Sequence, residues 1–171
     1  KDDHTDITSE DVRNLVLPPN WEPAARFGAS HADFYQAEDV VVDQNNTDFL
    51  ANSMWAKDRL LVWNPANAND ELAFKLPVLQ AGKYVIRMTA AHTPRSGKLS
   101  IRLDGKEIGF GGEEGIVDLR VPYRTMARTV SSESIQLSQG DHVLSLHYRG
   151  DRPDSKDQQI GIDFFWVQKQ Q

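Results

Sequence analysis

Two pairs of carboxylates are the residues of this sequence that could take part in the hydrolysis of a glycosidic bond. They are Glu113 with Glu114, and Asp151 with Asp154. Glycosidases place two carboxyl groups about 5 Å apart, or about 6.5 to 9.5 Å apart, across the bond that breaks. Because the sequence does not determine either separation, a small polysaccharide lyase or hydrolase is the less favoured alternative.

Motifs of nucleophilic or zinc-dependent hydrolysis are missing from the sequence. It contains no Gly-x-Ser-x-Gly elbow, no His-Glu-x-x-His motif and no cysteine. His142 and His147 have an odd offset, which on a strand directs the two rings to opposite faces. The glycine-rich stretch 110–115 lacks the Lys-Ser or Lys-Thr ending of a phosphate loop. We therefore predict no catalytic residues.

Aromatic side chains in polar loops suggest a different chemistry, because an aromatic ring can stack on the apolar C–H face of a sugar. Trp55 lies in a polar stretch without an apolar period, and we expect it to be an exposed platform. Tyr123 and Arg124 follow a proline in a second loop and are expected to form a wall beside it.

Polar side chains in the loops are candidates for hydrogen bonds with sugar hydroxyls. Asn52 and Asp58 flank Trp55, and Arg95 lies in the connection 92–97 between two predicted strands. The complete candidate ligand-binding set is Trp55, Tyr123, Arg124, Arg95, Asn52 and Asp58.

The elements that must position these loops are strands. Short runs of β-branched and aromatic residues alternate with Gly, Pro, Asn and Asp at spacings of about ten residues, which is typical of all-β domains. The expected strands are 34–42, 60–64, 71–77, 83–91, 98–103, 116–121, 128–137, 142–148 and 160–167. A single open sheet of this size would leave one apolar face in water. The sequence therefore predicts a two-sheet antiparallel β-sandwich.

Individual positions of this sandwich follow from the alternation of apolar residues. Tyr84, Ile86 and Met88 share one face of a strand and are expected in the core. Trp166 is also expected in the core, whereas Trp63 fits either a core or a binding role. The pair Asp104-Gly105 predicts a two-residue hairpin turn, in which both residues adopt positive φ.

Residues 1–32 differ in texture from the rest of the chain. They mix charges, prolines and an isolated Trp21 without a sustained period, so we expect an extended lead-in before a sandwich domain at 33–169. No apolar run approaches the ~20 residues that span a bilayer, and no signal-peptide pattern opens the chain. The sequence is typical of a mature fragment or an excised module, without membrane insertion.

The overall charge limits the classes of partner. The formal net charge is −6, and this long-range field repels phosphate backbones. Nucleic acid is therefore not an expected partner. The absence of cysteine excludes disulfides and thiolate metal sites.

Several short motifs between residues 34 and 167 resemble those of galactose-binding-like jelly-roll carbohydrate-binding modules, above all families six and thirty-five and related sandwich domains appended to bacterial polysaccharide-degrading proteins. The motifs are Tyr35 with Ala37-Glu38, Ala81-Gly82-Lys83-Tyr84, Leu103-Asp104-Gly105-Lys106, Gly140-Asp141-His142 and Gly161-Ile162-Asp163-Phe164. The resemblance implies the jelly-roll fold and a glycan ligand.

The same resemblance implies a structural calcium ion. In such modules a first-strand Glu and a last-strand Asp commonly join backbone carbonyls around it, and the matching residues here are Glu38 and Asp163. These modules often carry a second Glu two residues earlier, where this chain has Gln36. An amide oxygen can still bind calcium, but with one charge fewer the affinity is expected to fall. The alternative is that both carboxylates are only polar residues at strand ends.

Together these observations favour a non-catalytic carbohydrate-binding module of an exported bacterial polysaccharide-processing protein, which is secreted, periplasmic or at the cell surface. The main alternative is an ancillary domain that has no sugar ligand and braces a neighbouring catalytic domain.

Overall fold

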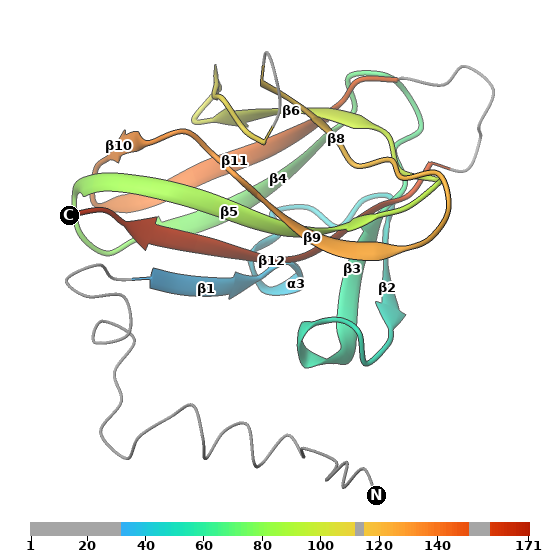
Figure 1. The fold of residues 1–171 in the computed structure, drawn as a ribbon. Coiled ribbons are helices and arrows are strands. Elements are labelled where there is room, and N and C mark those ends of the chain that lie inside the picture. The colour runs from blue at the N-terminus through green and yellow to red at the C-terminus, as the bar shows by residue number, and fades with distance from the viewer. Residues whose placement is uncertain (1–31, 112–114, 151–157) are drawn as a thin grey trace, which may run out of the picture.

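A computed structural model of the chain describes residues 32–111, 115–150 and 158–171. These residues form two antiparallel sheets packed face to face (Figure 1). The predicted all-β, two-sheet antiparallel sandwich is therefore confirmed. The division into a lead-in at 1–32 and a sandwich at 33–169 stays a prediction, because residues 1–31 lie outside the described residues.

In the part of the chain that the structure describes, the larger sheet has seven strands. They are β1 (Ala32–Gln36), β2 (Thr47–Ala51), β3 (Arg59–Trp63), β5 (Gly82–His92), β9 (Met126–Ser131), β10 (Ile135–Leu137) and β12 (Ile160–Lys169). β5 and β12 pair along the middle of the sheet. β9 and β10 pair with the far side of β5, β1 and β3 pair with the far side of β12, and β2 forms an edge beside β3.

The second sheet has five described strands. They are β4 (Glu71–Val78), β6 (Lys98–Leu103), β7 (Lys106–Glu107), β8 (Ile116–Asp118) and β11 (Gly140–Tyr148). Two short helical turns connect strands of the larger sheet, α3 (Ala37–Val40) and η1 (Ala56–Asp58). Within the described ranges no helix is long and apolar enough to span a lipid bilayer.

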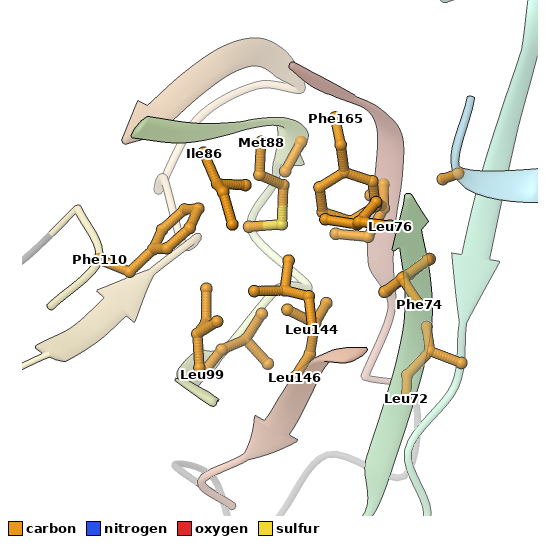
Figure 2. Close-up of a cluster of buried hydrophobic side chains, with 14 of the residues drawn as sticks. Leu72, Phe74, Leu76, Ile86, Met88, Leu99, Phe110, Leu144, Leu146 and Phe165 are labelled. Atoms are coloured by element: carbon orange, nitrogen blue, oxygen red, sulfur yellow. The ribbon is translucent and has the colours of Figure 1, made fainter. Parts of the chain in front are cut away.

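The core lies between the sheets and follows the alternation expected from the sequence. Tyr84, Ile86 and Met88 are all buried, as predicted. Figure 2 shows Ile86 and Met88 pointing toward Leu144 of the opposite sheet. Phe74 and Phe165 meet with ring centroids 4.7 Å apart. Trp63 is also in the core, which decides its role between the two alternatives.

The prediction that Trp166 lies in the core is wrong. A bulge in β12 between Ile162 and Phe164 shifts the register, so that Phe165 and Val167 face the core. Trp166 therefore lies on the outer face of the larger sheet. There its ring stacks on Phe34, with centroids 5.1 Å apart.

Three differences from the predicted strands have local causes. The strand predicted at 34–42 ends at Gln36, because the chain then crosses to the other sheet, where Val41 bridges to Phe74. The strand predicted at 128–137 is divided, because the Ser132 hydroxyl accepts a hydrogen bond from Ile86 N at 2.9 Å and occupies a place in the ladder. β2 was not predicted, since this edge strand buries few apolar side chains.

The Asp104-Gly105 hairpin turn is confirmed by positive φ values of 49° and 80°. A histidine from β11 holds it in place. His142 Nδ1 lies 2.7 Å from Asp104 Oδ2, and His142 Nε2 lies 2.8 Å from the Ser138 carbonyl oxygen. Both ring nitrogens therefore face acceptors, an arrangement that suits the doubly protonated imidazolium.

Candidate ligand-binding site

A pocket of about 360 Å³ opens on the outer face of the larger sheet, beside β2 and β3. These two strands are drawn at the lower right of Figure 1. Its floor lies outside the core because Leu60, Val62 and Ala91 alternate with core residues along their strands. The lining residues are Leu50, Trp55, Leu60, Val62, Ala91, Thr93, Pro94, Arg95, Thr125, Gln159 and Gly161.

The pocket has depth because β12 carries a glycine at its floor. Gly161 pairs with Ala91 on one side and with Val62 on the other. A Cβ atom at this position would lie 2.8 Å from Leu60 Cδ2 and 2.9 Å from Ala91 Cβ. Leu60 therefore packs down onto the glycine, and any side chain at position 161 would raise the floor.

Trp55 lines this pocket, but the prediction that it is an exposed platform is wrong, because only 5% of its surface is exposed. Its ring packs with Leu60 and Ala91 in a small apolar cluster on the outer face of the sheet. The cause is a closed turn at residues 52–58. Asn52 N donates to Asp58 O at 3.1 Å, and Asp58 N donates to Trp55 O at 2.9 Å.

The other predicted ligand residues fall into two groups. Arg95 lines the pocket. Asn52 and Asp58 close the Trp55 turn through their backbones and do not line the pocket. Their predicted role toward a ligand stays a prediction, whereas their part in shaping the turn is explicit in the structure.

Tyr123 and Arg124 are exposed in the loop before β9, and Tyr123 is 92% exposed. A parallel bridge between Thr93 and Arg120 joins this loop to the 93–96 loop. Thr125, two residues beyond Tyr123, lines the pocket. Among the large aromatic residues that the structure describes, Tyr123 and Phe34 are the exposed ones, and Tyr123 belongs to the loop that borders the pocket.

Sequence reasoning missed the aliphatic part of this site. Leu50, Leu60 and Val62 line the pocket, but none of them is polar or aromatic. One signal was present in the uninterrupted apolar run from Leu60 to Trp63. A strand that is apolar at every position has apolar side chains on both faces, and the outer face must then be covered or bind a ligand.

The predicted metal residues Glu38 and Asp163 come together behind the Trp55 turn. Asp163 is 3% exposed, and its carboxylate accepts a hydrogen bond from Ala56 N at 3.0 Å. Burial raises the pKa of Asp163, the Ala56 N–H bond opposes this, and the Glu38 charge raises the pKa further. Two carboxyl groups thus share a weakly solvated space.

Two buried oxygens of the segment 36–38 are of the kind that binds a hard cation. Glu38 Oε2 and Gln36 Oε1 are buried and have no hydrogen-bond partner, and buried polar atoms of this kind are uncommon. Calcium binds carboxylate, amide and carbonyl oxygens, so the residues present fit it. Among the described residues no group of three His, Cys, Asp or Glu side chains gathers that could hold a metal, so amide or carbonyl oxygens would have to complete the site.

Ser145, His147 and Glu71 lie close together but do not form a catalytic relay. Ser145 Oγ and Glu71 Oε2 approach the same atom of the His147 ring, Nε2, at 3.1 and 3.8 Å. A relay needs the acid on the other ring nitrogen. The carboxylate pairs Glu113 with Glu114 and Asp151 with Asp154 lie outside the described residues.

Comparison with known proteins gives matches at the level of fold. No family model matches the sequence, and no curated protein does. Among solved structures, Paenibacillus xanthan lyase matches 79% of this chain with a TM-score of 0.67 at 18% identity. This chain spans 13% of the length of that lyase chain.

Two carbohydrate-binding modules match over almost their whole length. A family 35 module from Clostridium thermocellum has a TM-score of 0.57 at 16% identity, over 80% of this chain and 97% of the module. The module CBM6cm-2 of lichenase 5A from Cellvibrio mixtus, solved in complex with cellotriose, has a TM-score of 0.53 at 16% identity, over 81% and 98%. These likenesses show that the sandwich is the jelly roll of such modules.

Proposed function

We propose that this chain is a non-catalytic carbohydrate-binding module and that the pocket beside Trp55 is its glycan site. The observation that carries the proposal is the pocket itself, which combines an apolar floor with a rim of Thr93, Arg95, Thr125 and Gln159. A sugar presents C–H groups on its ring faces and hydroxyls around its edge, and therefore needs both kinds of contact. The jelly-roll fold shared with modules of families 6 and 35 supports the proposal.

A matched pair of variants tests the location of the site. Leu50 is 51% exposed and lines the pocket, whereas Leu79 is 61% exposed and lies elsewhere. Leu50→Asp and Leu79→Asp introduce the same charge at surface leucines, but only the first places it in the apolar wall.

The assay is calorimetry against a panel of polysaccharides and oligosaccharides, with reducing-end measurements beside it. We expect binding without an increase in reducing ends, at least a tenfold loss of affinity in Leu50→Asp, and unchanged affinity in Leu79→Asp. If the wild-type chain binds no glycan of the panel, the ancillary interaction domain becomes the better interpretation.

We also propose that Glu38, Asp163 and the Gln36 amide oxygen hold a structural calcium ion. The two buried oxygens without partners and the buried Asp163 carboxylate support this. Calcium would neutralise the two carboxylates and so hold the last strand and the Trp55 turn together. A melting temperature that rises with calcium and falls with a chelator is the expected result.

We further propose that the module belongs to a larger, exported polysaccharide-processing protein, secreted, periplasmic or at the cell surface, beside a catalytic domain. The small share of the Paenibacillus xanthan lyase chain that this chain spans supports such an arrangement. Detection of the full-length protein in the extracellular or periplasmic fraction of its host would test it.

A further inference from the structure

We infer that the pocket selects a sugar that carries a methyl group, either the C6 methyl of a 6-deoxyhexose or the methyl of an acetyl substituent. The inference rests on the proposed glycan-binding function and specifies the ligand of the same site. It follows from the kind of apolar surface that the pocket offers.

The apolar wall of the pocket is aliphatic. Leu50 and Val62 contribute exposed or part-exposed surface, and Leu60 and Ala91 are buried lining residues. The one aromatic residue of the described lining is Trp55, which is almost wholly buried and packs with Leu60 and Ala91. The ring therefore supports these aliphatic residues and has little exposed surface on which a sugar could stack.

An aliphatic wall discriminates between ligands in a different way from an aromatic ring. Stacking on a ring depends on the flat C–H face that many hexoses share. Branched aliphatic side chains gain most from a compact apolar group, and burial of one methyl group corresponds to about a fourfold gain in affinity. A hydroxymethyl group in the same place would leave its hydroxyl without a partner, which adds a further penalty.

Part of the hydrogen-bonding capacity of the 93–96 loop is used within the fold. The Thr93 hydroxyl accepts from Arg95 N at 3.0 Å and from Ser96 N at 3.1 Å, and it lies 3.0 Å from Ser96 Oγ. The Gln159 carbonyl oxygen accepts from Ser96 Oγ at 3.2 Å. The Thr93 hydroxyl and the Gln159 backbone carbonyl oxygen thus stabilise the 93–96 loop, and polar contacts with a sugar fall to the other lining groups.

The experiment compares sugars that have the methyl-bearing group with matched sugars that have a hydroxyl or hydroxymethyl group in its place. The pairs are L-fucose with L-galactose and L-rhamnose with L-mannose for the deoxy source, and N-acetylglucosamine with glucose and an acetylated polysaccharide with its alkali-deacetylated form for the acetyl source. Calorimetry measures the affinities, and saturation-transfer NMR reports which ligand protons contact the protein. For either the deoxy pairs or the acetyl pairs, we expect the methyl-bearing sugar to bind about tenfold more tightly than its matched sugar. The strongest saturation transfer should then be at its methyl protons.

Two threonine variants provide the control. Val62→Thr replaces one wall methyl group by a hydroxyl, whereas Val143→Thr makes the same change at an exposed strand valine outside the lining. Only Val62→Thr should reduce the preference for the methyl-bearing sugar. Equal affinities within every pair would overturn the inference and leave glycan binding standing, whereas absence of binding across the whole glycan panel would overturn both.

Discussion

Replacement of Asp163 by Asn tests the cation site most directly. The substitution keeps an oxygen that accepts the Ala56 N–H bond but removes one of the two buried charges. A hydrogen bond to a charged group contributes about 1.5 to 3 kcal/mol, compared with about 1 kcal/mol for a neutral one. The weaker hydrogen bond in Asp163→Asn therefore costs up to about 2 kcal/mol of folding stability. Removal of a buried charge close to Glu38 offsets this cost.

Calcium changes this balance in the wild-type chain. At a concentration of 100 times its Kd, an ion that binds only the folded state stabilises it by about 2.7 kcal/mol. For a chain of this size, 1 kcal/mol corresponds to about 2 to 4 °C in melting temperature. We therefore expect a calcium-dependent shift of about 5 to 10 °C in the wild type and a much smaller shift in Asp163→Asn, whose amide oxygen is a weaker calcium ligand.

The assay is differential scanning calorimetry in calcium and in a chelator, with Asp39→Asn as the control. Asp39 is adjacent to Glu38 in sequence, but its side chain is 64% exposed and pairs with Lys57 at the surface, so the control should keep the full shift. The reasoning is refuted if the wild type melts at the same temperature in both buffers, or if Asp163→Asn keeps the calcium shift.

In the chelator, the raised pKa of Asp163 adds a second check. Its contribution to stability is complete below the ordinary value of 3.8 and is lost as the pH rises through the raised pKa.

Two further predictions concern buried residues. Burial alone lowers the pKa of His142, but the hydrogen bonds to the Ser138 carbonyl and to Asp104 together raise this pKa above 6.5. The stabilisation of the folded state by His142 is therefore complete below pH 6.5 and is lost as the pH rises through the raised pKa. Asp104→Asn should weaken this dependence in melting curves between pH 6 and 9, and an unchanged curve would contradict the assignment. Trp55→Ala should destabilise the chain by about 3 to 5 kcal/mol in denaturant unfolding, because Trp55 is buried; a loss below about 1 kcal/mol would show that its ring is not packed.

The sandwich could be predicted from the sequence because its strands show local signals. The alternation of Tyr84, Ile86 and Met88 needs no knowledge of the rest of the chain, and neither does the Asp104-Gly105 turn. β2 lacks such a signal, since Phe49 and Leu50 form an edge strand that is only partly covered. Its pairing depends on β3, which supplies the other half of the ladder.

The binding site could be predicted only in part, because its geometry depends on contacts distant in sequence. Trp55 lies among polar residues, and its burial follows from a turn that Asp163 holds through Ala56 N from 107 residues away. The bulge that inserts Asp163 also moved Trp166 out of the core. Glu38 and Asp163 were identified through a resemblance to known modules, whereas the aliphatic lining at Leu60 and Val62 needed the structure.

The hydrogen bond between Ala56 N and Asp163 places one carboxylate between two sites. The Glu38 charge acts on this carboxylate, and the amide whose hydrogen bond it accepts belongs to the residue after Trp55, which lines the pocket. If glycan binding changes the proton or cation affinity of Asp163 through this bond, protonation or cation binding at Asp163 must change the glycan affinity by the same factor. The titration of Asp163 followed by NMR, with and without a glycan, would measure this coupling.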